Sequence, residues 1–448
     1  MFHRVFIANR GEVAARLVRA CHKMGIEAVC AASQPDLSAG YPYLKEAAEV
    51  VNLGPGNAAE SYLKMEQVVQ AAKQTHCTAL HPGWGFLAEN PRFAALCEEH
   101  GITFIGPAPE VMDRMGRKVS SRMAAAAAGL PVVPGSVGLL DNVEEAIAVA
   151  NDIGYPVVLK ADAGGGGRGI RRCDSEADIQ TAFAEASREA IAAFGNGDLY
   201  LEKYLLGGRH IEFQILGDGR GKAIHLGERE CSIQRRHQKL LEEAPSPVID
   251  AKSRAHYGGL SAAAAAQWNY AGAGTMEYLM ADDGKLYFLE MNTRLQVEHP
   301  VTEQITGIDI VEAQIRIAAG EGLPCTQEEV QWNGHAMEVR LNAEDPEQDF
   351  RPAPGVVEAL SFPPENVRID THMVAKARIS PFYDSLLAKV IAYGSTREET
   401  IENMLACLEG TNIQGVPTTA KLHLSILQHE DFRAGNFDTL WLGEFLNG

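Results

Sequence analysis

The chain has 448 residues, which is enough for roughly two to four domains with substantial cores. Its composition is that of an ordinary globular protein, with 46% hydrophobic and 22% charged residues. The formal net charge of -19 disfavours nucleic acid and anionic membranes as partners. Its apolar runs all fall short of the about 20 residues needed to cross a bilayer, so we expect a soluble protein.

The eight cysteines are scattered along the chain and form no C-x-x-C pair. Neither a zinc site nor a disulfide framework is therefore indicated, and the pattern favours a reducing, cytoplasmic location. The apolar run VFIA near the N-terminus is broken by Asn9, Arg10 and Gly11, so it is too short for the core of a signal peptide.

Residues 1–115 alternate strand-like and helix-like segments. A buried strand over 4–8 is followed by a turn, by apolar residues at helical spacing and by the strand IEAVCAA. A helix over 61–73, the strand TALHP, a helix over 91–99 and the strand ITFIGP follow. This order predicts an open, Rossmann-like α/β domain, although its first turn lacks the G-x-G-x-x-G of a dinucleotide site.

Residues 116–325 form the second predicted domain. The prolines of LPVVPGS indicate a boundary, and the strand carrying Lys160 then enters four glycines and leaves as a second strand. A P-loop and a Rossmann turn both lead into a helix, so neither fits. A flap over a triphosphate fits, and so does a plain mobile loop. We expect residues 132–204 to form a mobile lid with a helix over 176–194.

The most informative stretch runs from GTMEYLMA through ADDGK to LYFLEMNTRLQVEHPVTE, and it predicts a hairpin. If the loop is 282–285, Ala281 faces Leu286, and counting back along both strands places Glu277 opposite Glu290. Directly opposed residues have Cβ atoms roughly 5 Å apart, and like charges there are destabilising. A divalent cation between the two carboxylates would remove the repulsion.

Beyond Glu290, polar residues occupy every second position, as Asn292, Arg294, Gln296 and Glu298. In an extended chain these side chains share one face. Oxygen ligands, an arginine and a further carboxylate along one edge fit a magnesium nucleotide beside an anionic substrate. A solvated edge strand is the alternative explanation of the alternation.

Further polar residues lie in or beside strand-like runs of the central region, where a solvent-exposed sheet face would explain each one singly. Together with the glutamate pair they indicate a nucleotide site, because the basic ones would balance the about four negative charges of a triphosphate. They are Lys118, Lys160, Glu202, His210, Gln234, His237 and Lys239.

Residues 330–448 change to short strand patterns, namely HAMEVRLNAED, GVVEALSF, VRIDTHM and LLAKVIAYG, followed by a helix over 397–409. They predict a third, α+β domain. Arg340 lies on its first strand, and the region contains no evident metal or nucleophile constellation.

With these segments placed, the sequence strongly resembles biotin carboxylase, the ATP-grasp component of acetyl-CoA carboxylase and its relatives. The segments that carry the resemblance are IANRGE, HPGWGFLAEN, FIGP, MGRKV, GGGGRG, EKYL, ERECSIQRRHQK, GAGTMEYL, EMNTRLQVEHPVTE, RLNAEDP and FYDSLLAK. The resemblance implies an ATP-grasp fold with a Rossmann-like N-terminal domain, a lid and a C-terminal biotin carboxylase domain.

The resemblance also implies roles for individual residues. ATP would be bound by Lys118, Lys160, the glycines including Gly166 and Gly167, Glu202, Lys203, Tyr204, Leu205, His210, Gln234 and His237. Magnesium or manganese would be held by Glu277, Glu290 and Asn292. Bicarbonate would be held by Lys239, Arg294, Gln296 and Val297, with Glu298 as the base and Arg340 facing biotin.

The implied reaction has two steps: bicarbonate, deprotonated by Glu298, attacks the γ-phosphorus of ATP, and the carboxyphosphate formed then carboxylates biotin. The sequence contains no A-M-K-M or V-M-K-M segment, so we expect the biotin to arrive on a separate carrier protein. Carboxyltransferase subunits and a homodimer are also implied. An ATP-grasp ligase that joins a carboxylate to an amine and a non-catalytic scaffold subunit are the alternatives.

Overall fold

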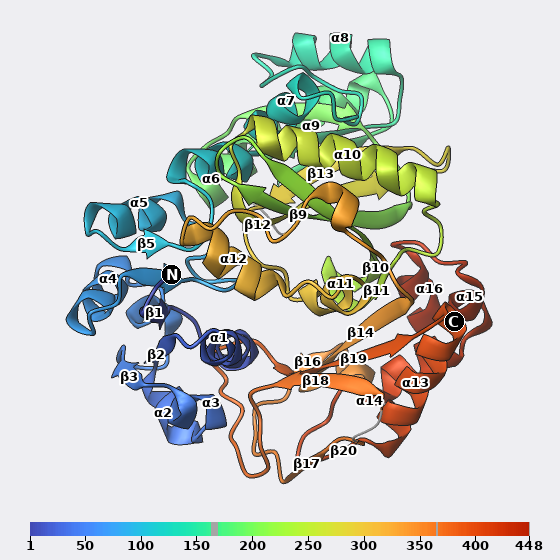
Figure 1. Cartoon of the computed structure of the whole chain (residues 1–448). Coiled ribbons are helices and arrows are strands. Elements are labelled where there is room, and N and C mark those ends of the chain that lie inside the picture. The colour runs from blue at the N-terminus through green and yellow to red at the C-terminus, as the bar shows by residue number, and fades with distance from the viewer. Residues whose placement is uncertain (163–168, 364–365, 448) are drawn as a thin grey trace.

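The computed structural model describes residues 1–162, 169–363 and 366–447. Its N-terminal part is a parallel sheet with the strand order β3-β2-β1-β4-β5, as the Rossmann-like pattern predicts (Figure 1). The elements are β1 (Arg4–Ile7), α1 (Gly11–Lys23), β2 (Glu27–Ala32), α2 (Gln34–Ala39), α3 (Pro42–Glu46), β3 (Glu49–Asn52), α4 (Met65–Gln74), β4 (Ala79–His81), α5 (Pro91–Glu99), β5 (Thr103–Phe104) and α6 (Pro109–Gly116). Separate apolar clusters cover its two faces, as a buried parallel sheet requires.

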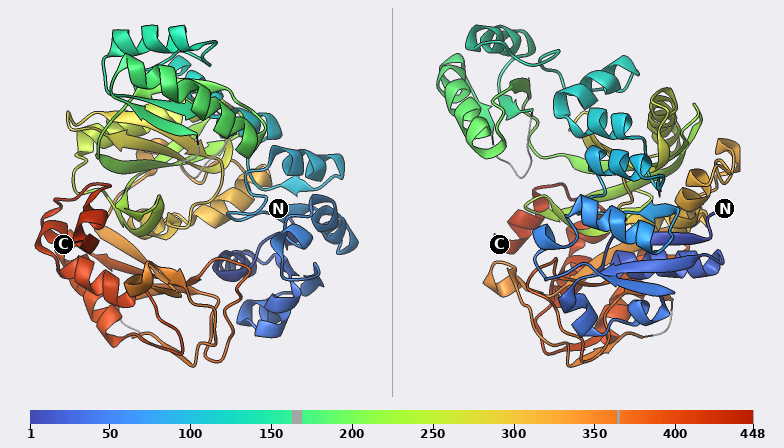
Figure 2. Two further views of the ribbon diagram at one scale, coloured as in Figure 1. Left: turned by 180° about the vertical axis from the view of Figure 1, so that it is seen from behind. Right: turned by 90° about the vertical axis from the view of Figure 1, so that its left-hand side faces the viewer.

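A small antiparallel sheet with the order β7-β6-β8 stands apart from the rest, together with α8 and α9 (Figure 2). The elements of this part are α7 (Lys118–Ala127), α8 (Val143–Ile153), β6 (Val157–Ala161), β7 (Ile170–Cys173), α9 (Glu176–Phe194) and β8 (Leu199–Lys203). The predicted helix over 176–194 is confirmed. It begins where the Ser175 hydroxyl accepts a hydrogen bond from the Asp178 N–H, and it ends at Gly195 in the left-handed conformation.

The central sheet has eight antiparallel strands in the order β13-β12-β9-β10-β11-β14-β19-β18. Its strands are β9 (Arg209–Asp218), β10 (Ala223–Arg235), β11 (Gln238–Ala244), β12 (Ala271–Met280), β13 (Leu286–Asn292), β14 (His335–Asn342), β18 (Val367–Thr371) and β19 (Leu386–Gly394). The helices α10 (Ala251–Gln267), α11 (His299–Thr306) and α12 (Ile310–Ala318) pack against it.

The strands that we assigned to a third domain continue this same sheet. Strand β14 pairs with β11 from Leu241 opposite Val339 to Ala244 opposite Ala336. Arg340 therefore lies on a strand directly beside the strand of Lys239. The remaining elements are β15 (Glu344–Asp345), β16 (Arg351–Pro352), β17 (Ala359–Ser361), α13 (Arg397–Gly410), β20 (Asn412–Gln414), α14 (Ala420–Gln428), α15 (Glu430–Ala434) and α16 (Trp441–Asn447).

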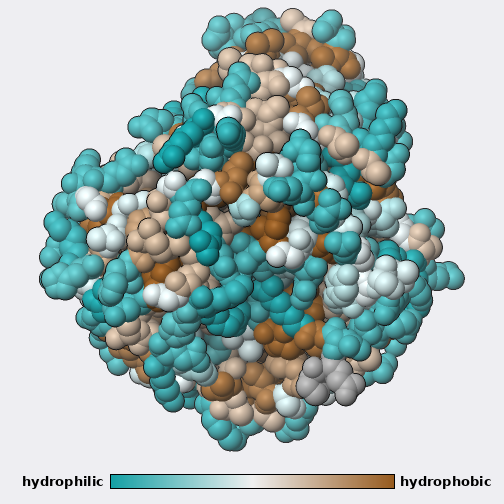
Figure 3. Space-filling model, in the orientation of Figure 1, coloured by the Kyte–Doolittle hydropathy of each residue, from teal (hydrophilic) through white to brown (hydrophobic). Residues whose placement is uncertain are grey.

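On the face of the molecule drawn in Figure 3, hydrophilic residues predominate and hydrophobic ones form small groups between them. Within the described part of the chain, every helix is too short or too polar to span a membrane. All eight cysteines are free thiols.

A β-bulge in β10 decides which way its central charged residue points. His225 pairs with Ile215 of β9, but Glu228 pairs with Phe213, so β10 has one extra residue between these pairs. Because side chains alternate between the two faces of a strand, the extra residue reverses the orientation of every residue after it. Arg229 is thereby placed opposite Glu212, on the opposite face from His225.

Gly227 permits this bulge, so Gly227→Ala is expected to destabilise the fold. Its φ is +89°, and an added Cβ would lie 2.5 Å from Trp332 Nε1, which is itself held by the Leu226 carbonyl. The strained φ and the overlap together should cost about 2 to 4 kcal/mol of unfolding free energy in urea denaturation.

Gly25→Ala is the matched control. Gly25 also has a positive φ, +70°, but an added Cβ meets nothing within 4 Å. It should cost only the conformational strain, about 1 kcal/mol. Equal losses in the two variants would contradict the steric role of Gly227.

Candidate active site

The hairpin of β12 and β13 places Glu277 directly opposite Glu290, as predicted, but by a different route. The strands begin with Met280 opposite Leu286, one residue away from the expected pairing of Ala281 with Leu286. A bulge at Leu289 then inserts one residue before Glu290, since Tyr278 pairs with Phe288 and Glu277 with Glu290. The two offsets cancel, and the carboxylates meet.

The expected extended polar face beyond Glu290 is wrong in its geometry. Strand β13 ends at Asn292, and the following residues form a loop up to Glu298, the N-cap of α11. The loop nevertheless brings the polar side chains together. Arg294 donates hydrogen bonds to Asn292 Oδ1 and Gln296 Oε1, both at 3.2 Å. Residues 293–298 are called the acid loop below, because they end on Glu298.

Lys239 is the centre of the charged network. Its Nζ lies 2.5 Å from Glu212 Oε2, 2.9 Å from Glu277 Oε1 and 2.7 Å from Glu298 Oε1. These carboxylates come from β9, β12 and the start of α11. Burial favours a neutral lysine, but the three carboxylates outweigh it and hold the pKa of Lys239 well above its usual range. The ammonium is therefore charged at neutral pH.

Glu298 is fully buried between two cations, since its other oxygen accepts from Arg340 Nη2 at 2.8 Å. Burial by itself would raise the pKa of Glu298, but Lys239, Arg340 and Arg229 hold it well below the usual range of a glutamate. Glu298 is thus a charged carboxylate, able to accept a proton. Arg340 also pairs with Glu242 of β11.

Like Glu242, two further acidic residues of the site are not among those predicted from the sequence. Glu89, from the turn after β4, accepts from Arg294 Nε at 2.8 Å and from the Thr293 N–H at 2.9 Å. It therefore fixes the acid loop from the N-terminal domain. Glu212 bridges Lys239 and the buried Arg229. In the sequence, Glu212 is distinguished only as an acidic residue between the apolar residues Ile211 and Phe213.

A second basic group lies toward the small sheet. Lys160 of β6 pairs with Glu202 of β8, which also lies 3.2 Å from Arg122 Nε. Lys118, the first residue of α7, lies close enough to Glu290, Lys160 and Glu202 to interact with their charges. Burial lowers the pKa of Lys118, and its charge would suit an anionic ligand reaching from the small sheet to Glu290.

The other residues predicted to bind the nucleotide have fewer contacts with the charged network. His210 Nε2 lies 3.2 Å from Glu277 Oε2. The Lys203 ammonium donates to the carbonyls of Gly154 and Tyr155 instead of reaching the charged groups. Tyr204 lies against the Arg172 guanidinium, and His237 is exposed with a φ of +65° in the turn between β10 and β11. Gln234 lies in β10 opposite Lys239, Leu205 lies just after β8, and Gly166 and Gly167 lie outside the described residues.

The glutamate pair fits a divalent cation. Burial and the negative charge of Glu277 raise the pKa of Glu290. The two carboxylates therefore repel each other, and a cation between them would relieve this repulsion. Carboxylate and amide oxygens, as in Glu277, Glu290 and Asn292, are the ligands that magnesium and manganese prefer. Each oxygen of Glu277 also has a neighbour in the protein: Oε1 lies 2.9 Å from Lys239 Nζ, and Oε2 lies 3.2 Å from His210 Nε2.

Comparison with protein families accounts for almost the whole chain. Residues 1–112 match the biotin carboxylase N-terminal domain, residues 117–326 the ATP-binding domain of the carbamoyl-phosphate synthase L chain, and residues 338–444 the biotin carboxylase C-terminal domain. Together with the charged site between its sheets, this fold defines an ATP-grasp ligase. The chain belongs to the biotin carboxylase family.

Similar proteins agree over the full length. The small subunit of 2-oxoglutarate carboxylase from Hydrogenobacter thermophilus is 48% identical over 99% of this chain and 94% of its own. A biotin carboxylase from a Nostoc species is 48% identical over 99% of both chains. Among solved structures, the biotin carboxylase domain dimer of the Hydrogenobacter enzyme, with MgADP and bicarbonate, has a TM-score of 0.92 at 48% identity over 99% of this chain and 98% of that chain. A Campylobacter jejuni biotin carboxylase has a TM-score of 0.94 at 42% identity over 99% of both chains.

Glu290→Gln is expected to weaken metal binding at the glutamate pair. The variant keeps an oxygen ligand but removes one of the two negative charges that attract the cation. Titration with Mn²⁺ in the presence of ADP, followed by electron paramagnetic resonance, should show at least about a tenfold loss of affinity, which corresponds to about 1.4 kcal/mol.

Asp283→Asn provides the control for the metal titration. Asp283 lies in the loop of the same hairpin and pairs there with the exposed Lys285. Its loss removes the same charge without touching the pair, so Mn²⁺ affinity should stay at the wild-type value. An unchanged affinity in Glu290→Gln would contradict the assignment of Glu290 as a metal ligand.

Proposed function

We propose that this chain is the biotin carboxylase of a biotin-dependent carboxylase. It carboxylates biotin with bicarbonate and converts ATP to ADP and phosphate. The observation that carries this proposal is the buried Glu298 carboxylate, which Lys239 and Arg340 keep charged beside the bicarbonate residues implied by the family resemblance. The full-length similarity to proteins named biotin carboxylase supports it.

In the first step, Glu298 takes the proton of bicarbonate. Lys239 and Arg294 hold the anion by charge, while Gln296 and the Val297 backbone orient it toward the γ-phosphorus. Attack then forms carboxyphosphate and ADP. Lys118 and Lys160 offset the negative charge of the phosphates, and a metal held by Glu277, Glu290 and Asn292 would supply further neutralisation of that charge.

In the second step, carboxyphosphate breaks down to carbon dioxide and phosphate, and the phosphate removes the ureido proton of biotin. Arg340 is suited to stabilise the resulting enolate, because its guanidinium is fixed by Glu242 and Glu298 on a rigid strand of the central sheet. Arg294, which Glu89 holds in place, would bind the charged carboxyphosphate until it breaks down.

Residues 132–204 would act as the lid. They have their own apolar core, which includes Leu140, Val157 and Leu201, and they carry Lys160 and Glu202. Closure of this unit would bring those side chains over the nucleotide and exclude water from carboxyphosphate. The boundaries 1–115, 116–325 and 330–448 are retained as part of this proposal, with the central sheet running across the last of them.

The proposed partners follow from the family. A separate carrier protein would present biotin to the Arg340 side of the site, and carboxyltransferase subunits would use the carboxybiotin. A homodimer is supported by the Hydrogenobacter biotin carboxylase domain, whose structure is a dimer. A cytoplasmic location is proposed from the unpaired cysteines.

Glu298→Gln tests the function directly. ADP formation by the wild type should require bicarbonate and rise further with biotin, and biotinylated carrier should be a better acceptor than free biotin. The variant should bind ATP normally but lose about 10²- to 10⁴-fold in bicarbonate-dependent turnover, because the amide cannot accept the proton. Near-normal turnover would remove Glu298 from its role, and bicarbonate-independent hydrolysis by the wild type would contradict the function.

Lys239→Met is expected to shift the pH dependence of kcat/KM for bicarbonate. The ammonium favours the charged form of Glu298, so removing it lets burial raise the pKa of that carboxyl. Glu298 then becomes protonated at a higher pH, and the acidic limb of the profile moves upward.

Lys285→Met serves as the control for the pH profile, since Lys285 is an exposed lysine whose ion pair is with Asp283 in the loop of the hairpin. Its profile should coincide with that of the wild type. An acidic limb that stays in place in Lys239→Met would show that Lys239 does not set the protonation of Glu298.

A further inference from the structure

Two of the segments that carry the family resemblance, IANRGE and FYDSLLAK, have no residue in the mechanism above. They end on Glu12 and Lys389, and the structure brings these two residues together. Glu12 lies in the first turn of α1 and is 3% exposed, while Lys389 lies in the middle of β19 and is 0% exposed. The Lys389 Nζ is 3.2 Å from Glu12 Oε1. The pair therefore joins the N-terminal domain to the last strands of the central sheet.

The same ammonium reaches the acid loop. Lys389 Nζ donates a hydrogen bond to the Val297 carbonyl oxygen at 2.9 Å. Val297 immediately precedes Glu298, so this bond holds the backbone that carries the base. A charged donor makes a shorter and stronger bond than a neutral one, and burial shields it from competing water.

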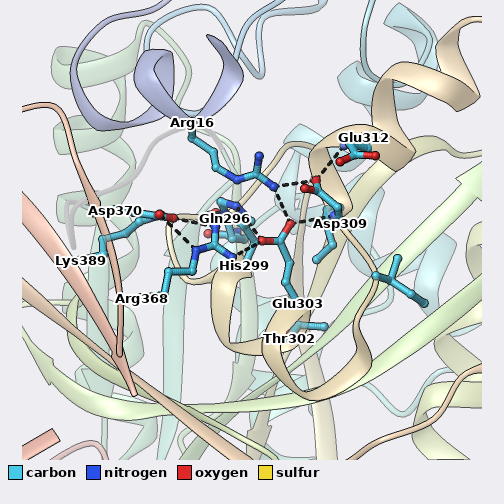
Figure 4. A network of polar contacts seen from close by, with 12 residues as sticks. Arg16, Gln296, His299, Thr302, Glu303, Asp309, Glu312, Arg368, Asp370 and Lys389 are labelled. Atoms are coloured by element: carbon cyan, nitrogen blue, oxygen red, sulfur yellow. Dashed lines mark hydrogen bonds and ion pairs between the residues drawn. The ribbon is translucent and has the colours of Figure 1, made fainter. Parts of the chain in front are cut away.

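The neighbours of Lys389 hold it in this orientation. Across the sheet it lies between Arg340 on β14 and Asp370 on β18. Asp370 Oδ2 is 4.0 Å from Nζ and is itself paired with Arg368, as Figure 4 shows. Attraction by Asp370 and Glu12 restrains the ammonium in this orientation.

A second buried side chain holds the preceding residue of the acid loop. His299 Nδ1 lies 2.7 Å from the Gln296 carbonyl oxygen. Burial lowers the pKa of His299 well below its usual range, so the ring is neutral, and the short contact with a carbonyl places its proton on Nδ1. Two successive carbonyls, those of Gln296 and Val297, are thus each fixed from outside the loop, and Figure 4 shows Gln296, His299 and Lys389 gathered in one network.

We propose that Lys389 is a positioning residue of the carboxylation reaction, which fixes the Val297 carbonyl and thereby the bicarbonate residues and the Glu298 base, with Glu12 aiming its ammonium. This inference rests on the proposed function. Stability alone explains the pair poorly, because a buried ion pair contributes little more than apolar residues of similar size. The flanking residues of β19 are apolar, so methionine or leucine would suit a merely structural position.

The test must separate positioning from folding, because Lys389→Met alone leaves Glu12 as an unpaired buried carboxylate and destabilises the protein. The double variant Lys389→Met with Glu12→Gln removes both charges. It should recover much of the folding stability lost by the single variant, while the bond to Val297 stays absent. Urea denaturation measures the recovered folding stability, and steady-state kinetics measures the effect of the missing bond on turnover.

In the double variant, kcat/KM for bicarbonate should fall by at least about tenfold, and up to about 10²-fold, since small misplacements of reacting groups have effects of that size. The affinity for ATP, measured by calorimetry, should remain that of the wild type, because the nucleotide residues lie on other strands. Lys389→Arg, which keeps a charged donor, should retain more of the bicarbonate-dependent rate than Lys389→Met.

Arg397→Met is the matched control. Arg397 is another largely buried cation that pairs with a glutamate, Glu243, and donates to backbone carbonyls, those of Phe432 and Arg433. The bonds found for it do not reach the acid loop. Its loss should lower stability while leaving kcat/KM for bicarbonate unchanged.

The outcomes are distinguishable. A folded double variant with wild-type kcat/KM for bicarbonate would overturn the positioning role of Lys389 while leaving the proposed function intact. An equal fall in ATP affinity and in bicarbonate kcat/KM would also overturn it, since that pattern indicates general distortion. Failure of the proposed function itself would be seen in the wild type, as ATP hydrolysis whose rate does not depend on bicarbonate.

Discussion

The site depends on one buried ammonium. Lys239 lies among carboxylates from three segments of the chain, namely Glu212, Glu277 and Glu298. Without a cation there, their mutual repulsion and the cost of burying them would drive one or more of them to take up a proton. With it, Glu298 stays charged and able to act as a base, and Glu277 stays charged and able to bind a metal. The two proposed roles, a base at Glu298 and a metal ligand at Glu277, thus share one electrostatic cause.

The continuous antiparallel sheet explains why these groups converge. Lys239 and Arg340 lie on the neighbouring strands β11 and β14, and Lys389 lies on the next strand, opposite Arg340. Side chains alternate between the two faces of each strand, so a single bulge at Gly227 is enough to direct Arg229 toward Glu212. The strands of the C-terminal region are therefore part of the active-site scaffold, although family comparison divides the chain before them.

The sequence predicts the parts of the site whose residues lie close together along the chain. The opposition of Glu277 and Glu290 follows from a hairpin count, and it was correct because a shifted turn and a bulge offset each other. The extended polar face after Asn292 was wrong, because alternation of polar residues cannot distinguish a strand from a loop whose side chains converge. Glu89 was missed because its partner Arg294 lies 205 positions away along the chain.

By itself the sequence determined the segments that become strands and helices, the family and the glutamate pair, because periodicity and hairpin turns act over short stretches of chain. The tertiary structure alone decided the bonds of Lys239 to Glu298, 59 residues away, and of Lys389 to Val297, 92 residues away. No local pattern specifies which buried cation meets which acceptor at such separations. The order of strands in the sheet and the packing of α1 and α11 against it select those partners, since only buried charges with a matched neighbour are tolerated there.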